Sequence, residues 1–329
     1  MNKIEFGDCR DTMRRWAADG VRVQTCVTSP PYFGLRDYGH EGQIGLEQTP
    51  EEYIAAMAEV FRCVREVLAD DGTLWLNIGD SYANVGKWGG STSGKHVKEL
   101  HGVQQSSGRL RETSAGLVEA GYKPKDLIGI PWLLAFALRA DGWYLRQDII
   151  WHKPNPMPES VRDRCTKAHE YIFLLSKSER YFYDHEAAME PVAASTVERL
   201  SQPTLHQQEG SDRVPGKTNG NMKAVGRTDK RNRRSVWTVA TRPYKGAHFA
   251  TFPPALIEPC ILAGSRPGDV VLDPFMGSGT TAAVALQHGR QYLGCELNAE
   301  YGALQAARIA LAMPEPVNDN QQSLFAATA

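Results

Sequence analysis

Two short motifs in this 329-residue sequence have residue types that could do chemistry. The first follows Thr28 and consists of Ser29, Pro30, Pro31 and Tyr32. Two successive prolines fix φ and supply no N–H, so this backbone presents acceptors in a stiff geometry, here the Pro30 carbonyl beside the Ser29 hydroxyl. Tyr32 adds an aromatic face on which a planar group can stack. The motif therefore predicts a site that holds a planar substrate against hydrogen-bond acceptors.

The second motif is a glycine-rich turn, DPFMGSGT at residues 273–280, and Glu296 follows it. Glycines allow a ligand to approach the backbone closely, and an acidic residue after the next strand can bind ribose hydroxyls. Gly277 to Ala282 also fits the G-x-G-x-x-G/A fingerprint, so a nicotinamide oxidoreductase is one interpretation. Only 57 residues include and follow Asp273, too few for the remaining strands of a dinucleotide fold. The amino-terminal segment must complete the sheet, and this order counts against the oxidoreductase.

The elements that must position these motifs alternate between strands and helices. Strands are expected at residues 3–6, 23–27, 73–78, 143–151, 270–272 and 291–295. Helices are expected at residues 11–18, 51–68, 127–139, 254–263, 278–288 and 299–312. Asp71-Gly72 is expected to form a turn, and residues 168–175 and 180–183 a closing antiparallel hairpin. The alternation predicts an α/β fold with a mostly parallel sheet covered by helices on both faces.

The composition is that of an ordinary globular protein, with 42% hydrophobic and 23% charged residues. No apolar run approaches the roughly 18 residues of a membrane span, and no signal peptide is recognisable, so we expect a cytoplasmic protein without a membrane partner. The six cysteines show no C-x-x-C, and the nine histidines show no H-x-x-x-H or H-E-x-x-H. Neither a disulfide framework nor a metal site is expected.

The formal net charge of −1 hides two basic segments. From Arg213 to Arg234 there are eight basic residues and one acidic residue, a net charge of +7 in 22 residues. From Lys87 to Lys125 there are seven basic and three acidic residues, a net charge of +4. Segments of this kind suit phosphate contacts with DNA, and the alternative is a solvated loop without a partner.

Further motifs add to the first two: GDC at 7–9, DGTLW at 71–75, IWHKP at 150–154, HE at 169–170 and HFATFP at 248–253. With them, the sequence resembles the amino-methylating DNA methyltransferases of the β arrangement, in which the catalytic loop precedes the target-recognition region and the S-adenosylmethionine (SAM) site. The resemblance runs from Phe6 to about Ala312. It implies a Rossmann-like SAM methyltransferase fold in circularly permuted order, with inserted DNA-recognition segments.

The resemblance also implies how the chain is divided. Residues 1–186 would form the catalytic half, with 83–123 as a loop insertion, and 187–235 the target-recognition segment. Residues 236–312 would be the SAM-binding half that completes the same domain, and 313–329 a flexible tail. Double-stranded DNA is the implied partner, with a cognate restriction endonuclease as a further candidate. A monomer or a homodimer is expected.

Particular residues receive roles from this resemblance. Ser29, Pro30, Pro31 and Tyr32 would be catalytic. The residues expected at SAM are Asp8, Phe252, Pro253, Asp273, Phe275, Gly277, Gly279 and Glu296. Among them, Glu296 would take the ribose hydroxyls and Asp8 the adenine amine, although Asp8 also suits a helix cap. The residues expected at DNA phosphates are Lys230, Arg231, Arg233 and Arg234.

The implied reaction is methylation of an exocyclic amine, whose lone pair is delocalised into the base. Acceptors around the nitrogen localise that lone pair and stabilise the positive charge that develops. Ser before Pro-Pro-Tyr goes mostly with cytosine N4 in the resembling family, and Asp with adenine N6, so cytosine N4 is expected and adenine N6 is the alternative. More remote alternatives are methylation of RNA or of a protein glutamine, and a non-catalytic DNA-binding module.

Overall fold

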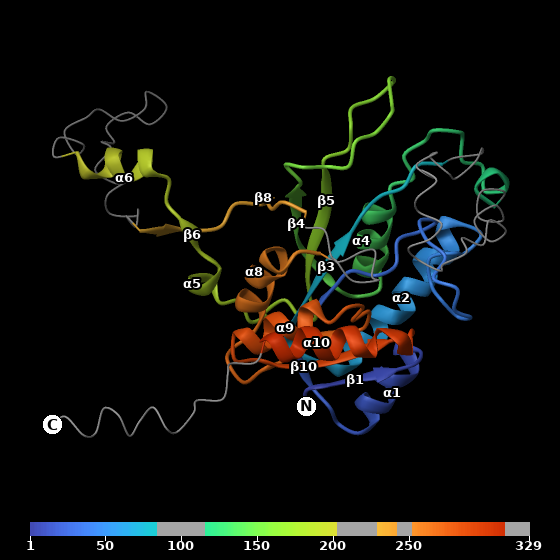
Figure 1. Ribbon diagram of the computed structural model, residues 1–329, viewed down its shortest axis with the longest axis horizontal. Coiled ribbons are helices and arrows are strands. Elements are labelled where there is room, and N and C mark those ends of the chain that lie inside the picture. The colour runs from blue at the N-terminus through green and yellow to red at the C-terminus, as the bar shows by residue number, and fades with distance from the viewer. Residues whose placement is uncertain (84–115, 203–228, 242–251, 313–329) are drawn as a thin grey trace.

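A computed structural model describes residues 1–83, 116–202, 229–241 and 252–312 (Figure 1). The strands of its main sheet are Lys3–Phe6 (β1), Val23–Thr28 (β2), Leu68–Ile78 (β3), Tyr144–His152 (β4), His169–Ser176 (β5), Val236–Thr238 (β8), Val270–Asp273 (β9) and Gln291–Glu296 (β10). Their order is β1-β10-β9-β2-β3-β5-β4-β8. The first five run parallel, and β5 is antiparallel to both β3 and β4. The predicted fold class, with a permuted order and a closing antiparallel pair, is confirmed.

Helices cover both faces of the sheet. On one face lie Cys9–Ala18 (α1), Pro50–Val67 (α2) and Ile130–Ala140 (α4), and on the other Pro254–Gly264 (α8), Thr280–Gln287 (α9) and Gly302–Ala312 (α10), which follows the short 3-10 helix Ala299–Tyr301 (η2) (Figure 1). Neighbouring strand residues supply the two cores: Cys26 packs with α1, α2 and α4, whereas Val27 packs with α8 and α9. Strands buried on both faces are expected for a parallel sheet.

Local capping explains where the helices begin. The Asp8 carboxylate accepts a hydrogen bond from Arg10 N at 2.8 Å, so α1 begins at Cys9, two residues before the predicted start. Helix α4 begins at Ile130, three residues after the predicted start. Gly129 precedes it with φ of 85°, and Asp80 Oδ1 accepts from Gly129 N and Ile130 N at 2.9 and 3.0 Å. An acceptor at the end of β3 thus fixes the helix start.

Two sequence predictions are wrong. Asp71-Gly72 is part of β3 rather than a turn, and the β2–β3 register shifts between Val23 and Thr25 to accommodate the extra residues. The antiparallel partners of β5 are β3 and β4, and residues 180–183 form no strand of the sheet. Instead Phe182 N donates to Asp71 O at 2.8 Å, and Lys177 N donates to Gly72 O at 3.2 Å. Tertiary hydrogen bonds therefore override the local turn signal.

A small arm, of which residues 185–202 and 229–231 are described, leaves the body beside α8 and projects to the left in Figure 1. Its described elements are His185–Ala188 (α5), Glu190–Pro191 (β6), Ala194–Ser201 (α6) and Lys230–Arg231 (β7). β6 and β7 pair antiparallel, and the chain then returns to the main sheet as β8. Most of the predicted 83–123 insertion, residues 203–228 of the predicted recognition segment and the 313–329 tail lie outside the described residues. Among the residues described, no helix is long and apolar enough to cross a membrane.

Candidate active site

The two motifs singled out in the sequence meet at the carboxyl ends of β2 and β9, which are neighbours in the sheet. Thr28 Oγ1, at the end of β2, donates a hydrogen bond to Asp273 Oδ1 at 2.6 Å. Thr281 Oγ1 donates to the other carboxylate oxygen of Asp273 at 2.7 Å. The residue before the Ser29–Tyr32 loop is thereby bonded to the residue that opens the glycine turn. Carboxyl ends of parallel strands at a switch in strand order are where α/β folds place their ligands.

Two side-chain hydroxyl groups hydrogen-bond the main chain of the Ser29–Tyr32 loop and of Phe33, which follows it. Tyr53 Oη, on α2, donates to Pro31 O at 2.8 Å, and Ser81 Oγ donates to Phe33 O at 3.0 Å. Both bonds reach main-chain carbonyls that pair with none of the described strands. Together with the fixed φ of Pro30 and Pro31, they hold the loop in one conformation.

Tyr32 is fixed at both its ring and its hydroxyl. Its ring lies against Gly79, where a Cβ added to the glycine would stand 2.6 Å from Tyr32 Cε2, so only glycine leaves room for the ring. Its hydroxyl donates to Glu170 Oε2 at 2.8 Å, and Ser29 Oγ lies 3.5 Å from the same hydroxyl. Burial, and then the charge of Glu170, raise the pKa of Tyr32 well above its ordinary value. Tyr32 therefore remains a protonated donor.

Glu170, at the start of β5, receives donors on both of its oxygens. Lys153 Nζ forms an ion pair with Oε1, and Asn77 Nδ2 lies 3.4 Å from Oε2. The Lys153 ammonium is also 4.3 Å from the ring centroid of Trp151. Sequence reasoning assigned no catalytic role to Lys153, Glu170 or Asn77, and left Glu170 open as a DNA or structural contact. The available signal was that Lys153 and Glu170 lie within the IWHKP and HE motifs.

The glycine turn after β9 is hydrogen-bonded to Glu296 at the end of β10. Gly277 and Gly279 have φ of 52° and 82°, a backbone region that favours glycine. Gly277 N donates to Glu296 Oε2 at 2.7 Å, and Asn298 N donates to Oε1 at 2.9 Å. Each oxygen retains a lone pair that a ribose hydroxyl can reach. A turn of glycines beside an oriented carboxylate fits a nucleoside-containing cofactor such as SAM.

Burial perturbs the two carboxyl groups of this turn. It raises the pKa of Glu296 to about 7, although the amides of Asn298 and Gly277 act in the opposite direction. It also raises the pKa of Asp273 to about 6, against the lowering effect of its hydrogen bonds from Thr28, Thr281 and Phe275 N. Perturbed carboxyl groups of this kind concentrate at functional sites.

The remaining residues predicted at SAM surround this turn to different degrees. Asp8 follows β1, whose Phe6 is in register with Glu296, and its carboxylate both caps α1 and pairs with Arg10 Nη2 at 2.5 Å. The hydrogen bond from Arg10 lowers the pKa of Asp8. Pro253 is buried as the N-cap of α8, and Phe252 is half-buried against the core beside it. Phe275 is half-buried against the opposite core.

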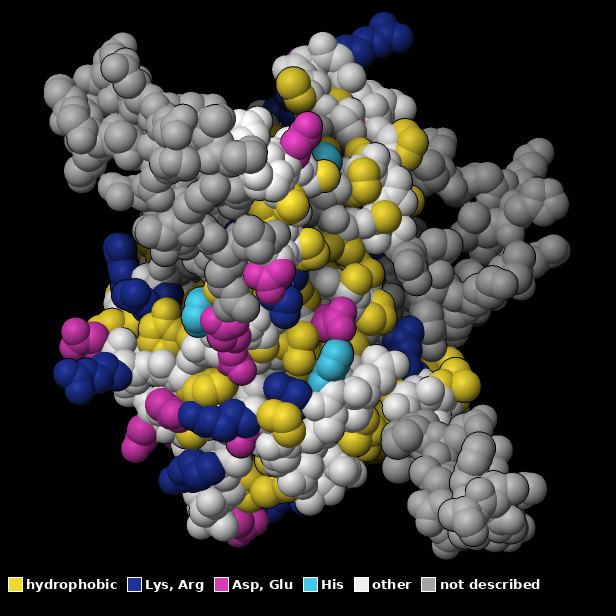
Figure 2. All heavy atoms as spheres, turned by 90° about the vertical axis from the view of Figure 1, so that its left-hand side faces the viewer, with side chains coloured by type: hydrophobic (Ala, Val, Ile, Leu, Met, Phe, Trp, Pro, Cys, Tyr) yellow, Lys and Arg dark blue, Asp and Glu magenta, His cyan; other side chains and the backbone are white. Residues whose placement is uncertain are grey.

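The four residues predicted at DNA phosphates divide into two pairs. Arg231 Nε donates to Glu190 Oε1 at 2.8 Å, and Arg233 lies 5.4 Å from the Trp237 ring centroid while donating to Ala188 O. Lys230 and Arg234 are exposed. Figure 2 shows that basic and acidic side chains are interspersed over the described part of this side of the molecule. Arg231 and Arg233 thus brace the arm, whereas Lys230 and Arg234 have charges open to solvent.

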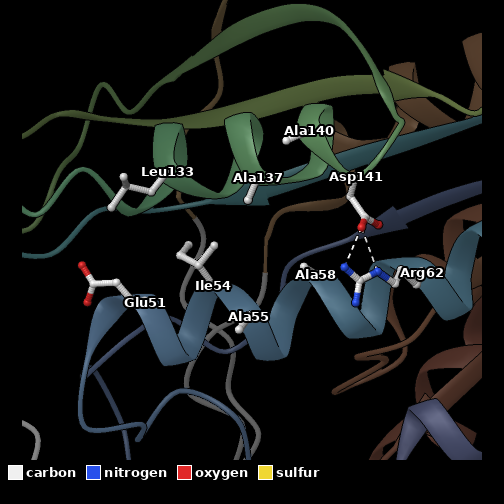
Figure 3. Close-up of a pocket in the computed structure, with 9 residues that line it drawn as sticks. All are labelled: Glu51, Ile54, Ala55, Ala58, Arg62, Leu133, Ala137, Ala140 and Asp141. Atoms are coloured by element: carbon white, nitrogen blue, oxygen red, sulfur yellow. Dashed lines mark hydrogen bonds and ion pairs between the residues drawn. The ribbon is translucent and has the colours of Figure 1, made fainter.

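A separate groove of about 490 Å³ runs between α2 and α4 (Figure 3). Small side chains make its floor, and the Arg62–Asp141 ion pair closes one end, with the two charged atoms 2.6 Å apart. Its lining residues are Glu51, Ile54, Ala55, Ala58, Arg62, Leu133, Ala137, Ala140 and Asp141. None belongs to the predicted catalytic or cofactor set. Over the described ranges, no three His, Cys, Asp or Glu side chains gather as metal ligands.

Comparison with known proteins agrees with this geometry. The family model of DNA methylases of the N6 and N4 type matches residues 23–307. The type II methyltransferase M.SmaI of Serratia marcescens is 48% identical over 307 residues, which are 93% of this chain and 90% of the relative. The type II methyltransferase M.Cfr9I of Citrobacter freundii is 46% identical over 303 residues, 92% of this chain and 86% of the relative.

Solved structures share the fold at lower identity. The PvuII DNA methyltransferase, described as cytosine-N4-specific, has a TM-score of 0.59 and 18% identity, covering 98% of this chain and 90% of that one. TTHA0409 of Thermus thermophilus, solved in complex with SAM, has a TM-score of 0.55 and 22% identity, covering 96% of both chains. The family match excludes the oxidoreductase interpretation of the glycine turn. The chain belongs to the family of SAM-dependent DNA amino-methyltransferases.

Proposed function

We propose that the protein transfers the methyl group of SAM to the N4 amine of a cytosine in double-stranded DNA, at a specific sequence. The observation that carries the proposal is the 2.6 Å hydrogen bond between Thr28 and Asp273. It joins the loop that would hold the amine to the turn that would hold the cofactor. A methyl donor and an amine must be held close together and in line for a direct displacement. This hydrogen bond fixes the catalytic loop relative to the glycine turn.

Bound SAM supplies an electrophilic methyl group on a sulfonium sulfur. The turn at Gly277 and Gly279 would admit its amino-acid portion against the backbone, and Glu296 would accept hydrogen bonds from the ribose hydroxyls. Asp8 and Phe252 would contact the adenine end. Transfer would form one N–C bond and break one S–C bond, with the electron pair left on sulfur, and the proton that the amine loses would pass to solvent water.

The Ser29–Tyr32 loop would act on the amine. Ser29 Oγ and Pro30 O would accept hydrogen bonds from the two N–H groups, which draws the nitrogen lone pair out of the ring and stabilises the developing positive charge. The Tyr32 ring would stack on the base. A base stacked inside a duplex cannot present its amine to this loop, so the target nucleotide would rotate out of the stack.

Cytosine N4 is favoured over adenine N6 by the neutral acceptor at position 29. Ser29 holds the place that an aspartate takes in most adenine enzymes of the resembling family, and the cytosine-N4-specific PvuII enzyme shares the fold. The relatives named type II methyltransferases support a modification enzyme that acts in the cytoplasm with a cognate endonuclease. The predicted recognition segment, residues 187–235, would then supply target contacts.

Mass analysis of nucleosides after incubation with DNA and SAM tests the proposal. The expected product is N4-methylcytosine. N6-methyladenine as the only product would replace cytosine by adenine as the target. If neither forms although SAM binds in a calorimetric titration, the DNA amine assignment is overturned, and absence of SAM binding would point to a DNA-binding module.

A further inference from the structure

A serine at the first position of the catalytic loop poses a directional problem. A carboxylate can only accept hydrogen bonds, whereas the Ser29 hydroxyl is both a donor and an acceptor, and its proton rotates to suit its surroundings. The amine of the target base brings two donors. For Ser29 to accept from the amine, its own proton must point to another acceptor.

Such an acceptor is present at the Tyr32 hydroxyl. Ser29 Oγ lies 3.5 Å from Tyr32 Oη, and Tyr32 Oη lies 2.8 Å from Glu170 Oε2. The Tyr32 hydroxyl has one proton, and it goes to Glu170 because the other acceptor within reach, Asn77 Oδ1, is farther away at 3.4 Å. The lone pairs of Tyr32 then face Ser29. The chain of hydrogen bonds therefore runs in one direction, from Ser29 to Tyr32 to Glu170, and leaves the Ser29 lone pairs free to accept from the amine.

The direction depends on Glu170 being an obligate acceptor. Within the described ranges, three side-chain atoms hydrogen-bond Glu170, and all are donors: Tyr32 Oη, Asn77 Nδ2 and Lys153 Nζ. Lys153 and Glu170 are largely buried, with 18% and 17% of their side chains exposed, so the ion pair is only weakly screened. Lys153 and Asn77 hold the carboxylate in place, and Asn77 is itself fixed because its Nδ2 also donates to Tyr171 O at 3.1 Å.

We propose that Glu170 is a positioning residue for methyl transfer, which acts through Tyr32 to orient the Ser29 hydroxyl as an acceptor for the amine. This inference rests on the proposed function, because it needs an amine at Ser29. Glu170 itself need not touch the base. The role predicts an effect on the chemical step and little effect on binding of DNA or SAM.

Glu170→Gln is the decisive variant because it keeps shape and removes charge. Its amide NH2 can donate to Tyr32 Oη, which reverses the chain of hydrogen bonds and turns the Ser29 proton towards the amine. We expect kcat to fall about 10- to 100-fold, as when an oriented group in an electrostatic site is lost. KM for DNA and Kd for SAM should change less than about threefold, which is under 1 kcal/mol.

Glu159→Gln is the matched control. Glu159 lies in the β4–β5 connection and is likewise ion-paired, with Arg164 Nη1 at 2.5 Å, and among the described residues no hydrogen bond joins it to Ser29, Tyr32 or Glu170. It should retain wild-type kcat. Tyr32→Phe keeps the ring and removes the hydroxyl, so it should lower kcat by a similar factor. Because both changes interrupt one set of bonds, the double variant Tyr32→Phe/Glu170→Gln should be no slower than the slower single variant.

Three results would overturn the proposal. These are an unchanged kcat in Glu170→Gln, a loss confined to KM or to SAM affinity, and losses in the two single variants that multiply in the double variant. If Glu170→Gln does not fold, Tyr32→Phe alone must show the loss in kcat at unchanged KM. Failure of the proposed function is distinguishable, since wild-type protein would then yield no N4-methylcytosine.

Discussion

Thr28 and Asp273 are 245 residues apart in sequence, yet Thr28 Oγ1 donates to Asp273 Oδ1 at 2.6 Å in the buried centre of the sheet. Thr28 directly precedes the catalytic loop, and Asp273 opens the glycine turn. A hydrogen bond at this place couples the position of one half of the site to the other. Its removal should therefore affect stability and transfer together.

Thr28→Val should lower the free energy of unfolding by about 1–3 kcal/mol, the cost of leaving a buried charged acceptor without one donor. The folded-state pKa of about 6 for Asp273 lies above the ordinary 3.8, so ionisation of Asp273 lowers stability as pH rises through this interval. Thr28 opposes that loss. The destabilisation should thus be larger at pH 8 than at pH 4.5 in urea titrations. Thr28→Ser, which keeps the hydroxyl, should restore most of the stability, and an equal loss in both variants would contradict the coupling.

Ser29→Ala and Tyr32→Ala should each reduce methyl transfer by at least about 100-fold, because they remove an acceptor for the amine and the stacking surface for the base. SAM affinity should stay largely intact, since neither side chain lies in the glycine turn. Single-turnover transfer of labelled methyl groups and calorimetric titration with SAM measure the two effects. Near wild-type turnover in both variants would refute the assignment of the loop.

Gly277→Val should abolish SAM binding in a folded protein. Gly277 has a φ of 52°, which a β-branched residue strongly disfavours, and its N–H orients Glu296. A branched side chain would also occupy space next to the backbone that the cofactor needs. Calorimetry together with a circular dichroism spectrum tests this. Undiminished affinity in a folded variant would mean that SAM binds elsewhere.

The affinity for SAM should depend on pH through Glu296. Burial raises the pKa of Glu296 to about 7, so the group is increasingly protonated below that pH and loses acceptor capacity for the ribose hydroxyls. Kd for SAM should therefore rise as pH falls from 8 to 6. Glu296→Gln should bind more weakly at pH 8 and show a flatter profile. A wild-type Kd constant over this range would contradict the assigned role.

Replacing the exposed cations of the arm should change DNA binding differently from replacing those that are hydrogen-bonded within the protein. Lys230→Ala/Arg234→Ala should weaken binding to all DNA and lower the slope of log K against log salt by about 2, one for each phosphate contact. Arg231→Ala/Arg233→Ala should chiefly loosen the arm, because these side chains bind Glu190 and Ala188 O. Fluorescence anisotropy at several salt concentrations separates the two. An unchanged slope in the first variant would leave the segment as a solvated loop.

The sequence predicted most of the layout because the relevant signals were local. The apolar run before Thr28 marked a buried strand, and parallel strands place their carboxyl ends at one edge, so the loop at Ser29 and the turn at Gly277 could be expected together. The prediction of a turn at Asp71-Gly72 was wrong because contacts distant in sequence determine the structure there. Gln24 Nε2 donates to Asp71 Oδ1 at 3.1 Å, and backbone N–H groups of residues 177 and 182 donate to the carbonyls of Gly72 and Asp71. A local sequence pattern encodes none of these contacts.

The network behind Tyr32 could not be predicted in the same way. Glu170 is 138 residues from Tyr32 in sequence, and its bond depends on the β3–β5 and β4–β5 registers. Lys153 and Glu170 each lie in a sequence motif. Which residues they contact, however, depends on the direction of side chains from β3, β4 and β5. Asp8 illustrates a different limit: one residue satisfies both the helix cap and the place expected beside the cofactor.

The position of β9 in the sheet has a consequence for how the chain matures. β9 lies between β10 and β2, so the strand next to the catalytic loop obtains its second neighbour only after some 240 further residues have been synthesised. Until then β2 keeps an open edge of unpaired N–H and C=O groups, and Val27 lacks the cover of α8 and α9. Contacts this distant in sequence form slowly. Aggregation and chaperone binding are therefore most expected while the amino-terminal half has been synthesised and β9 has not.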